Sequence, residues 1–366
     1  MNSHTVKQAF EKAIELQKSG STTQAITIYK DILDDDKANF EANFELGNCY
    51  KNCKDYNKAL FYLKEASKAN NKCYTCHYSM AEIYDKLCKY EFSLFHLEKV
   101  IRVCPEFYEV LFSIAQCYRK MKNEGKMHEY LNKTLAKLPE HPGANHLLAS
   151  LNEETKSDYS SLYARDLFDR YAGHFEEHLV SSLKYQVPFI IKEKLLSLNS
   201  AKDSKILDLG CGTGLLGKTV VDSFPNLVGV DISSNMIDET RKKDIYSELH
   251  TNDIQEFLLK SVQEYDLIIA ADVFIYIGAL KTIFSRIKKS INSNSYFIFT
   301  IELLNEFDKE SFHLAKSGRF SHTIEYIESL CKDYGFEIID KEKIILRQEN
   351  KIGQKGVIFI LKKDKS

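Results

Sequence analysis

The sequence contains no tryptophan and little glycine or proline. Its 366 residues include 15 glycines and 5 prolines, which excludes a collagen-like or long low-complexity chain. The 50 basic residues are balanced by 52 acidic ones. Without a basic excess, we expect no nucleic-acid partner. The longest apolar run covers only residues 267–280 and includes Asp272, so we also expect no membrane segment.

The nine cysteines do not indicate a disulfide framework, because their number is odd and most fall within helical patterns. Residues 1–10 lack the basic stretch followed by an apolar stretch that a secretory signal requires. Together these features predict reduced thiols and a cytoplasmic protein. The length favours two or three domains.

The first half of the chain repeats itself with a period of 34 residues. A small residue recurs at one slot, and larger apolar residues recur at fixed offsets from it. The small slot holds Ala13, Gly47, Ala81 and Ala115. The pattern resembles tetratricopeptide (TPR) repeats, with four repeats in register. We therefore predict an all-α TPR solenoid over residues 1–141, in which helix pairs stack because no single pair buries its apolar face alone. A capping helix and linker are expected over residues 142–160.

One aromatic position also recurs in all four repeats. It is occupied by Phe10, Phe44, Tyr78 and Phe112. In the TPR family this position faces the concave groove, so the resemblance implies a row of rings that grips an extended peptide or helix of a protein partner. The alternative is that each ring packs within its own array.

The second half, residues 161–366, alternates short apolar strands with helices. Strands are expected over 205–209, 227–230, 248–252, 265–271, 296–301, 336–346 and 356–361. Helices are expected over 162–180, 187–198, 215–224, 234–243, 278–291 and 321–334. This alternation predicts an α/β Rossmann-like domain with a mostly parallel seven-stranded sheet and an antiparallel last strand. Ligands of such sheets bind beyond the carboxyl ends of the strands.

A glycine loop follows the first of these strands and matches three motifs. Residues 212–219 fit the nucleotide P-loop pattern. However, Asp208 at the strand end has the wrong charge for a triphosphate. The dinucleotide pattern starting at Gly210 fails because Leu215 stands where a third small residue is required.

The third motif is acid-x-Gly-x-Gly-x-Gly, and it resembles motif I of class I S-adenosylmethionine (SAM) methyltransferases. Residues 167–179, 265–278 and 318–322, and the order of the two halves, resemble bacterial methyltransferases with N-terminal TPR repeats. SAM carries ribose hydroxyls and an ammonium group, which carboxylates bind well. The cofactor-binding residues implied are Tyr171, Asp208, Gly210, Gly212, Gly214, Asp231, Ile232, Met236, Asp253, Ile254 and Ala271.

The resemblance implies distinct roles within that set. Asp231 is expected to accept hydrogen bonds from the ribose hydroxyls, and Asp253 one from the adenine amine. Ile232 and Met236 would pack on the adenine ring. Tyr171 would close the pocket.

The acceptor is expected to lie near the fourth strand. Asp272 and Tyr276 follow that strand and should border the acceptor, and His322 is a candidate general base. The predicted function is methyl transfer from SAM to an unidentified acceptor, with the TPR array recruiting a protein or carrier-bound substrate. The alternative is a TPR scaffold whose second domain binds SAM without catalysis.

Residues 73–77 match the C-x-x-C-H signature of covalent haem attachment. Cys49 and Cys53, one helical turn apart in the preceding repeat, add ligand types that zinc prefers. No matching set of four ligands is evident, so we expect no metal and interpret these thiols as filling gaps between helices.

Overall fold

The computed structural model describes residues 3–152, 154, 159–198, 203–304, 310–349 and 351–364. The chain divides into two compact units, Met1–Ala144 and Asn145–Ser366. The division falls within α9 (Pro142–Leu151), close to the end of the repeats expected at residue 141.

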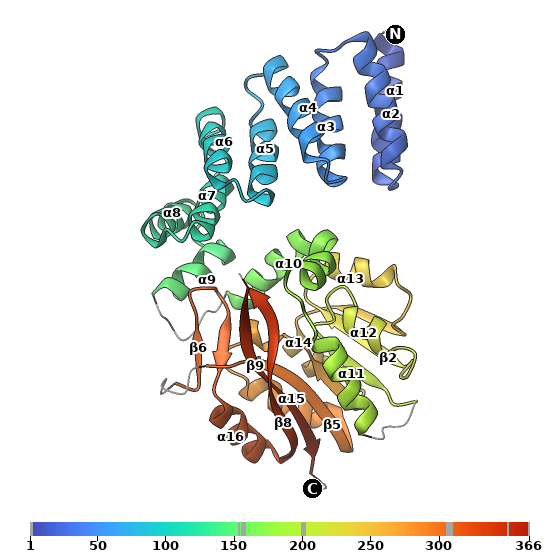
Figure 1. The fold of residues 1–366 in the computed structure, drawn as a ribbon, viewed down its shortest axis with the longest axis vertical. Coiled ribbons are helices and arrows are strands. Elements are labelled where there is room, and N and C mark those ends of the chain that lie inside the picture. The colour runs from blue at the N-terminus through green and yellow to red at the C-terminus, as the bar shows by residue number, and fades with distance from the viewer. Residues whose placement is uncertain are drawn as a thin grey trace. The chain divides into compact units, whose positions relative to one another are not determined.

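The first unit consists of antiparallel helix pairs, as the 34-residue period predicts (Figure 1). The pairs are α1 (Ser3–Lys18) with α2 (Thr22–Asp35), α3 (Phe40–Asn52) with α4 (Tyr56–Ala69), α5 (Tyr74–Lys86) with α6 (Tyr90–Val103), and α7 (Glu109–Lys120) with α8 (Glu124–Lys137). The small slot lies where the two helices of a pair approach. A Cβ atom on Gly47 would come within 2.8 Å of Leu63 Cγ, so a larger residue there would force the helices apart.

In each pair, the turn between the two helices contains one residue with a left-handed backbone. The φ angles are +83° at Gly20, +61° at Lys54, +56° at Cys88 and +57° at Lys122. These positions are 34 residues apart. Only the first is glycine, so three of the four turns hold a side chain in a region that L-residues disfavour.

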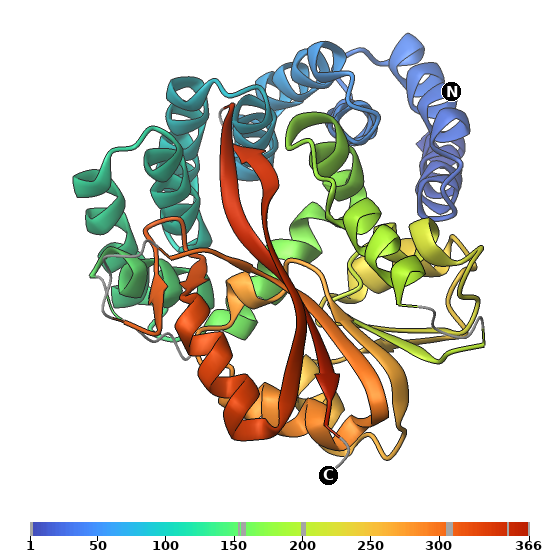
Figure 2. The ribbon, with the colours of Figure 1, turned by 60° about the horizontal axis from the view of Figure 1, so that its bottom comes forward.

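The second unit is built on one seven-stranded sheet of order β3-β2-β1-β4-β5-β9-β8. The strands are β1 (Ile206–Leu209), β2 (Leu227–Asp231), β3 (Glu248–Thr251), β4 (Tyr265–Ala270), β5 (Ile291–Glu302), β8 (Phe336–Glu349) and β9 (Ile352–Lys363). β1 to β5 pair in parallel, and β9 is antiparallel to both of its neighbours. The predicted sheet is therefore confirmed. Figure 2 shows the long β8–β9 pair in red.

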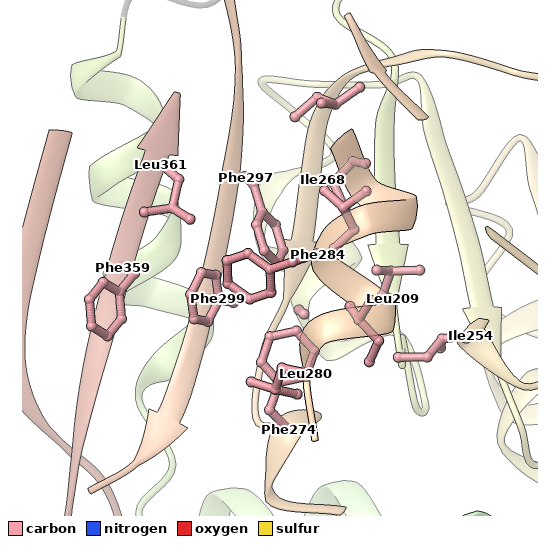
Figure 3. Packing of buried hydrophobic residues seen from close by; sticks show 14 of the residues in the cluster. Leu209, Ile254, Ile268, Phe274, Leu280, Phe284, Phe297, Phe299, Phe359 and Leu361 are labelled. Atoms are coloured by element: carbon pink, nitrogen blue, oxygen red, sulfur yellow. The ribbon is translucent and has the colours of Figure 1, made fainter. Parts of the chain in front are cut away.

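Alternation of side chains along the strands creates two cores. In β1, Leu207 and Leu209 face one core and Ile206 faces the other. Helices α14 (Ile254–Lys260), α15 (Lys281–Ser290) and α16 (Ile324–Tyr334) cover the first core. Helices α11 (Val187–Ser197) and α12 (Leu215–Val220) cover the second. Figure 3 shows the first core, where Phe284 of α15 packs edge-on against Phe297 and Phe299 of β5.

Several expected helix boundaries differ from the structure. The helix expected over 321–334 is shorter, because β7 (Phe320–His322) pairs with β6 (Phe312–Leu314) before α16 begins. The Thr323 hydroxyl accepts a hydrogen bond from the Tyr326 N–H at 3.2 Å and fixes that start. The helix expected over 162–180 is α10 (Ser160–Glu177) followed by the π-helix η1 (His178–Ser182). No helix in the described part of the chain is long and apolar enough to cross a membrane.

Candidate cofactor and acceptor site

The glycine loop between β1 and α12 has a left-handed backbone at three positions, all of them glycine. The φ angles of Gly210, Gly212 and Gly214 are +70°, +55° and +80°, values that favour glycine. A Cβ on Gly210 would lie 2.5 Å from Val273 Cγ2, and one on Gly214 would lie 3.0 Å from a methyl carbon of Thr240. The left-handed backbone therefore favours glycine at all three positions, and close packing adds to this preference at Gly210 and Gly214.

Asp231, the last residue of β2, holds this loop in place. Its Oδ2 accepts a hydrogen bond from the Gly212 N–H at 2.8 Å, and its Oδ1 accepts one from the Ser233 N–H at 2.9 Å. Its side chain is almost completely buried. Burial raises the pKa of Asp231 to about 6, although the two N–H donors oppose that change.

Asp208, in β1, lies beneath the same loop. Its Oδ2 accepts a 2.6 Å hydrogen bond from the Tyr246 hydroxyl. Burial, and then the charge of Asp231, raise the pKa of Asp208 to about 7, while the Tyr246 hydrogen bond opposes them. Sequence analysis missed Tyr246, whose ring also lies where a Cβ on Gly217 would be, 2.5 Å away. No ion pair joins either carboxylate to a cationic side chain within the described residues.

Helix α10 is fastened to the start of α13 (Ser234–Arg241), close to the glycine loop. Asp169 Oδ1 accepts a hydrogen bond from the Ser233 hydroxyl at 2.6 Å, and Asn235 donates one to the Asp169 carbonyl at 2.9 Å. Six residues after Asp169, Phe175 lies 3.6 Å from the Cβ position of Gly212. These contacts place α10 beside the loop, and sequence analysis did not assign Asp169 this role.

The remaining expected cofactor residues differ in accessibility. Met236 is completely buried, and Ile254 is 6% exposed. Ile232 directly follows Asp231 and is partly buried. Tyr171, on α10, is 42% exposed. Their contacts with adenine, and closure by Tyr171, stay predictions.

Two further residues at this edge have polar groups of interest. Asp253 caps α14, where its carboxylate accepts hydrogen bonds from the N–H groups of Gln255 at 2.8 Å and Glu256 at 3.4 Å. The Thr213 hydroxyl, in the glycine loop, is buried and has no hydrogen-bond partner within the described residues. A buried hydroxyl without a partner is costly, so it fits a ligand that carries polar groups.

The carboxyl end of β4 carries the second part of the site. Ala271, partly buried, leads to Asp272, whose φ is +57°. The Asp272 N–H donates a 2.8 Å hydrogen bond to the Thr300 hydroxyl of β5. Burial raises the pKa of Asp272, and the nearby charge of Arg347 opposes the change.

Arg347, in β8, is the centre of a buried ionic network. It is 2% exposed and contacts three carboxylates. Its Nη1 lies 3.3 Å from Asp272, its Nη2 2.5 Å from Glu302 and its Nε 2.8 Å from Glu349. Arg319 pairs with Glu349 as well. Burial alone would raise the pKa of Glu349, but the two arginines outweigh burial and hold that pKa below its ordinary value. Sequence analysis identified only Asp272 of this network.

Tyr276 connects this network to α10. It ends the 3-10 helix η2 (Phe274–Tyr276), and its ring packs edge-on against Phe168 of α10 with centroids 5.1 Å apart. Burial raises the pKa of Tyr276, and the positive charge of Arg319 opposes that change. Tyr276 is therefore protonated at neutral pH and able to donate a hydrogen bond.

His322, the candidate general base, lies in the interior of the second unit. It is completely buried, and its Nε2 lies 2.9 Å from the Gly278 carbonyl oxygen. Its ring stacks on Tyr326 with centroids 6.1 Å apart. Burial lowers the pKa of His322 to about 4. The side chain is thus neutral and anchors the segment after Tyr276. Its role as a general base stays a prediction.

The aromatic row expected in the TPR groove is not continuous. Phe112 is 2% exposed and packs against His141 with centroids 4.3 Å apart, so the prediction that it grips a partner is wrong. Phe10 packs against Tyr29, and Phe44 stacks on Phe40. These three rings follow the alternative interpretation, packing within their own array. Tyr78 is partly buried and hydrogen bonds with Ser113 at 3.2 Å.

Comparison with known proteins identifies both halves. Residues 171–341 match a family described as a methyltransferase domain, and residues 16–83 match the tetratricopeptide repeat. A malonyl-[acyl-carrier protein] O-methyltransferase of Legionella pneumophila is 25% identical over 194 residues, covering 50% of this chain and 67% of the relative. Its counterpart from Acetivibrio thermocellus is 32% identical over 112 residues, covering 29% of this chain and 38% of the relative.

Among solved structures, the similarity is lower. A magnesium protoporphyrin IX methyltransferase from Synechocystis PCC 6803, crystallised with bound SAH, is 16% identical with a TM-score of 0.45. The match covers 56% of this chain and 100% of that one. On the two family matches and the sheet described above, the chain carries a methyltransferase domain preceded by tetratricopeptide repeats.

Proposed function

We propose that the second unit binds SAM at the carboxyl edge of its sheet and transfers the methyl group to an acceptor. The observation that carries this proposal is the pair of buried carboxylates, Asp208 and Asp231, beside a loop of three left-handed glycines. Burial raises the pKa of both carboxyls, and no cationic side chain neutralises them within the described residues. A cationic nucleoside without phosphates complements that arrangement.

The residues present fit such a ligand. Asp231 would hold the ribose hydroxyls, because each of its oxygens retains a lone pair beyond the N–H bond that it already accepts. Asp208 would favour the ammonium end through its charge. The Thr213 hydroxyl would gain a partner.

When bound, SAM supplies a methyl group on a sulfonium, which is already activated for transfer. The protein therefore needs mainly to position the acceptor. Correct positioning can be worth about 7–11 kcal/mol. Asp272 and Tyr276 border this region, and the Phe168–Tyr276 contact links them to α10. We assign them to acceptor binding, with α10 excluding water.

For the acceptor, we propose a group presented by a protein, with the TPR array as the recruiting surface. Two observations support a carrier-bound acceptor. The relatives described above are named as methyltransferases of malonyl-[acyl-carrier protein], and the chain contains repeats of a family that binds proteins. Labelled SAM offered with a malonylated carrier protein and with a free malonyl thioester would test this: labelling of the free thioester alone would contradict recruitment through a carrier.

The SAM site is tested by calorimetric titration of the full-length protein. Asp231→Ala and Asp231→Asn should each weaken SAM binding at least about tenfold, since one charge-assisted hydrogen bond contributes about 1.5–3 kcal/mol. Glu264→Ala is the matched control, because Glu264 is exposed and precedes β4, at the opposite edge of the sheet. Equal SAM affinity in all four proteins would contradict the assignment. Binding without transfer to any acceptor would instead favour the scaffold alternative.

A further inference from the structure

Two cysteines of the first unit face each other at the start of α5. Cys73 is the N-cap residue, and its sulfur accepts a hydrogen bond from the Cys76 N–H at 3.2 Å. The two sulfur atoms are 2.8 Å apart. A disulfide bond is about 2.05 Å long, so only a small rotation of the side chains separates this pair from a covalent link.

The environments of the two sulfurs differ. Cys73 is 8% exposed, whereas Cys76 is completely buried. Burial raises the pKa of Cys76, and the neighbouring Cys73 sulfur adds to the effect. The Cys73 sulfur lies at the N-terminus of α5 and is the more accessible of the two. Cys73 is therefore suited to react with an external disulfide, and Cys76 is suited to resolve the mixed disulfide that forms on Cys73.

The metal interpretations of this motif find no support in the surroundings. His77 does not turn toward the two sulfurs but pairs with His96 of α6, with 3.1 Å between their Nδ1 atoms. Within the residues that the structure describes, no group of three or more His, Cys, Asp or Glu side chains is arranged to hold a metal ion. The two sulfurs thus have each other as their nearest reactive partners.

We propose that Cys73 and Cys76 form a redox-active dithiol, which closes reversibly to an intramolecular disulfide within the TPR unit. The oxidant is a low-molecular-weight disulfide of the glutathione class. The Cys73 thiolate attacks it, forming a mixed disulfide and releasing one glutathione thiolate. The Cys76 sulfur then attacks the Cys73 sulfur and expels the second glutathione, and the Cys76 proton passes to the departing glutathione thiolate. In sum the two cysteines lose two electrons and two protons, and the glutathione disulfide gains them.

The sequence permits a direct test on the full-length protein. Trypsin cleavage after Lys72 and Lys86 releases residues 73–86, which contain these two cysteines and no others. The protein is exposed to glutathione disulfide, its free thiols are alkylated in denaturant, and the tryptic peptides are measured by mass spectrometry. We expect peptide 73–86 to be unblocked and about 2 Da lighter than the dithiol form, the mass of two hydrogens. Treatment with dithiothreitol before blocking should restore the doubly blocked peptide.

Two exposed cysteines, Cys53 and Cys88, report whether the oxidant reached the protein. Cys76→Ser should accumulate glutathione on Cys73, because the resolving thiol is gone. Cys73→Ser should leave Cys76 unmodified, because it is completely buried. The proposal is overturned if peptide 73–86 stays a dithiol while Cys53 and Cys88 carry glutathione, or if the two variants behave alike. None of these outcomes depends on SAM binding or methyl transfer.

Discussion

SAM binding should weaken as the pH falls below neutrality, because the two carboxylates of the site bind protons there. Burial raises the pKa of Asp231 to about 6 and that of Asp208 to about 7. A cationic ligand prefers the ionised carboxylate, so protons and SAM compete for the site. The sign is therefore fixed: affinity is highest above pH 7 and declines as each carboxyl becomes protonated.

The magnitude follows from those pKa values. At pH 5 a carboxyl with a pKa of about 6 is about nine-tenths protonated, which costs about tenfold in affinity relative to pH 7.5. If Asp208 must ionise as well, its pKa of about 7 adds about another hundredfold at pH 5. The expected loss thus lies between about tenfold and about a thousandfold.

Calorimetric titration at pH 5, 6, 7 and 7.5 measures this loss, and two buffers with different ionisation enthalpies count the protons released. Circular dichroism at each pH controls for unfolding. The Asp208→Asn variant should remove the decline in SAM affinity that begins near pH 7, and the Asp231→Asn variant should remove the decline that begins near pH 6. Affinity that is constant across this range, or that increases in acid, would refute the reasoning that these carboxylates hold the cationic ligand.

Three other perturbations have defined outcomes. Asp208→Asn should stabilise the ligand-free protein by up to about 4 kcal/mol at pH 8, where the wild-type carboxylate is ionised and buried. This gain in the free energy of unfolding should vanish by pH 4. Urea unfolding at both pH values measures it, and equal stability of variant and wild type at pH 8 would contradict the raised pKa. Lys122→Gly should stabilise the TPR unit by about 1 kcal/mol because it relieves the left-handed backbone at residue 122, whereas Gly20→Ala should destabilise the unit. Melting temperatures that shift in the same direction for both variants would argue against backbone strain as the cause. Arg347→Met should destabilise the second unit by about 3–5 kcal/mol because it leaves buried carboxylates unpaired, and an unchanged melting temperature would show that the network contributes little.

Much of the fold was predictable because its signals are local or periodic. The TPR helices follow from small residues such as Gly47, whose neighbours leave no room for a Cβ. The glycine loop follows from three positions that require positive φ. In both cases a residue type at fixed spacing reports directly on backbone geometry. The same reasoning misses the turns at Lys54 and Lys122, where the backbone is left-handed without glycine.

The parts of the site that were missed depend on contacts between distant segments. Tyr246 reaches Asp208 across 38 residues, and Arg347 reaches Asp272 across 75. Neither residue has a local pattern that distinguishes it from an ordinary loop or strand residue. Sequence also did not reveal that His322, a residue type suited to catalysis, is buried by the β6–β7 hairpin. The residue type predicts which chemistry a side chain is able to perform, but tertiary packing decides whether that side chain is accessible.

The charges along the carboxyl edge of the sheet divide the proposed site into two halves of different charge. Beside the glycine loop, Asp208 and Asp231 have no cationic partner within the described residues, so this half is complementary to an external cation. Near Tyr276 the carboxylates are paired with Arg319 and Arg347, so that half is largely neutralised from within. A neutralised surface holds its side chains rigidly but exerts little net attraction on a charged acceptor. If the proposed function is correct, we expect shape, hydrogen bonding and delivery, rather than charge, to select the acceptor. This division suits methyl transfer, in which the electrophile is activated before it binds and the protein supplies geometry.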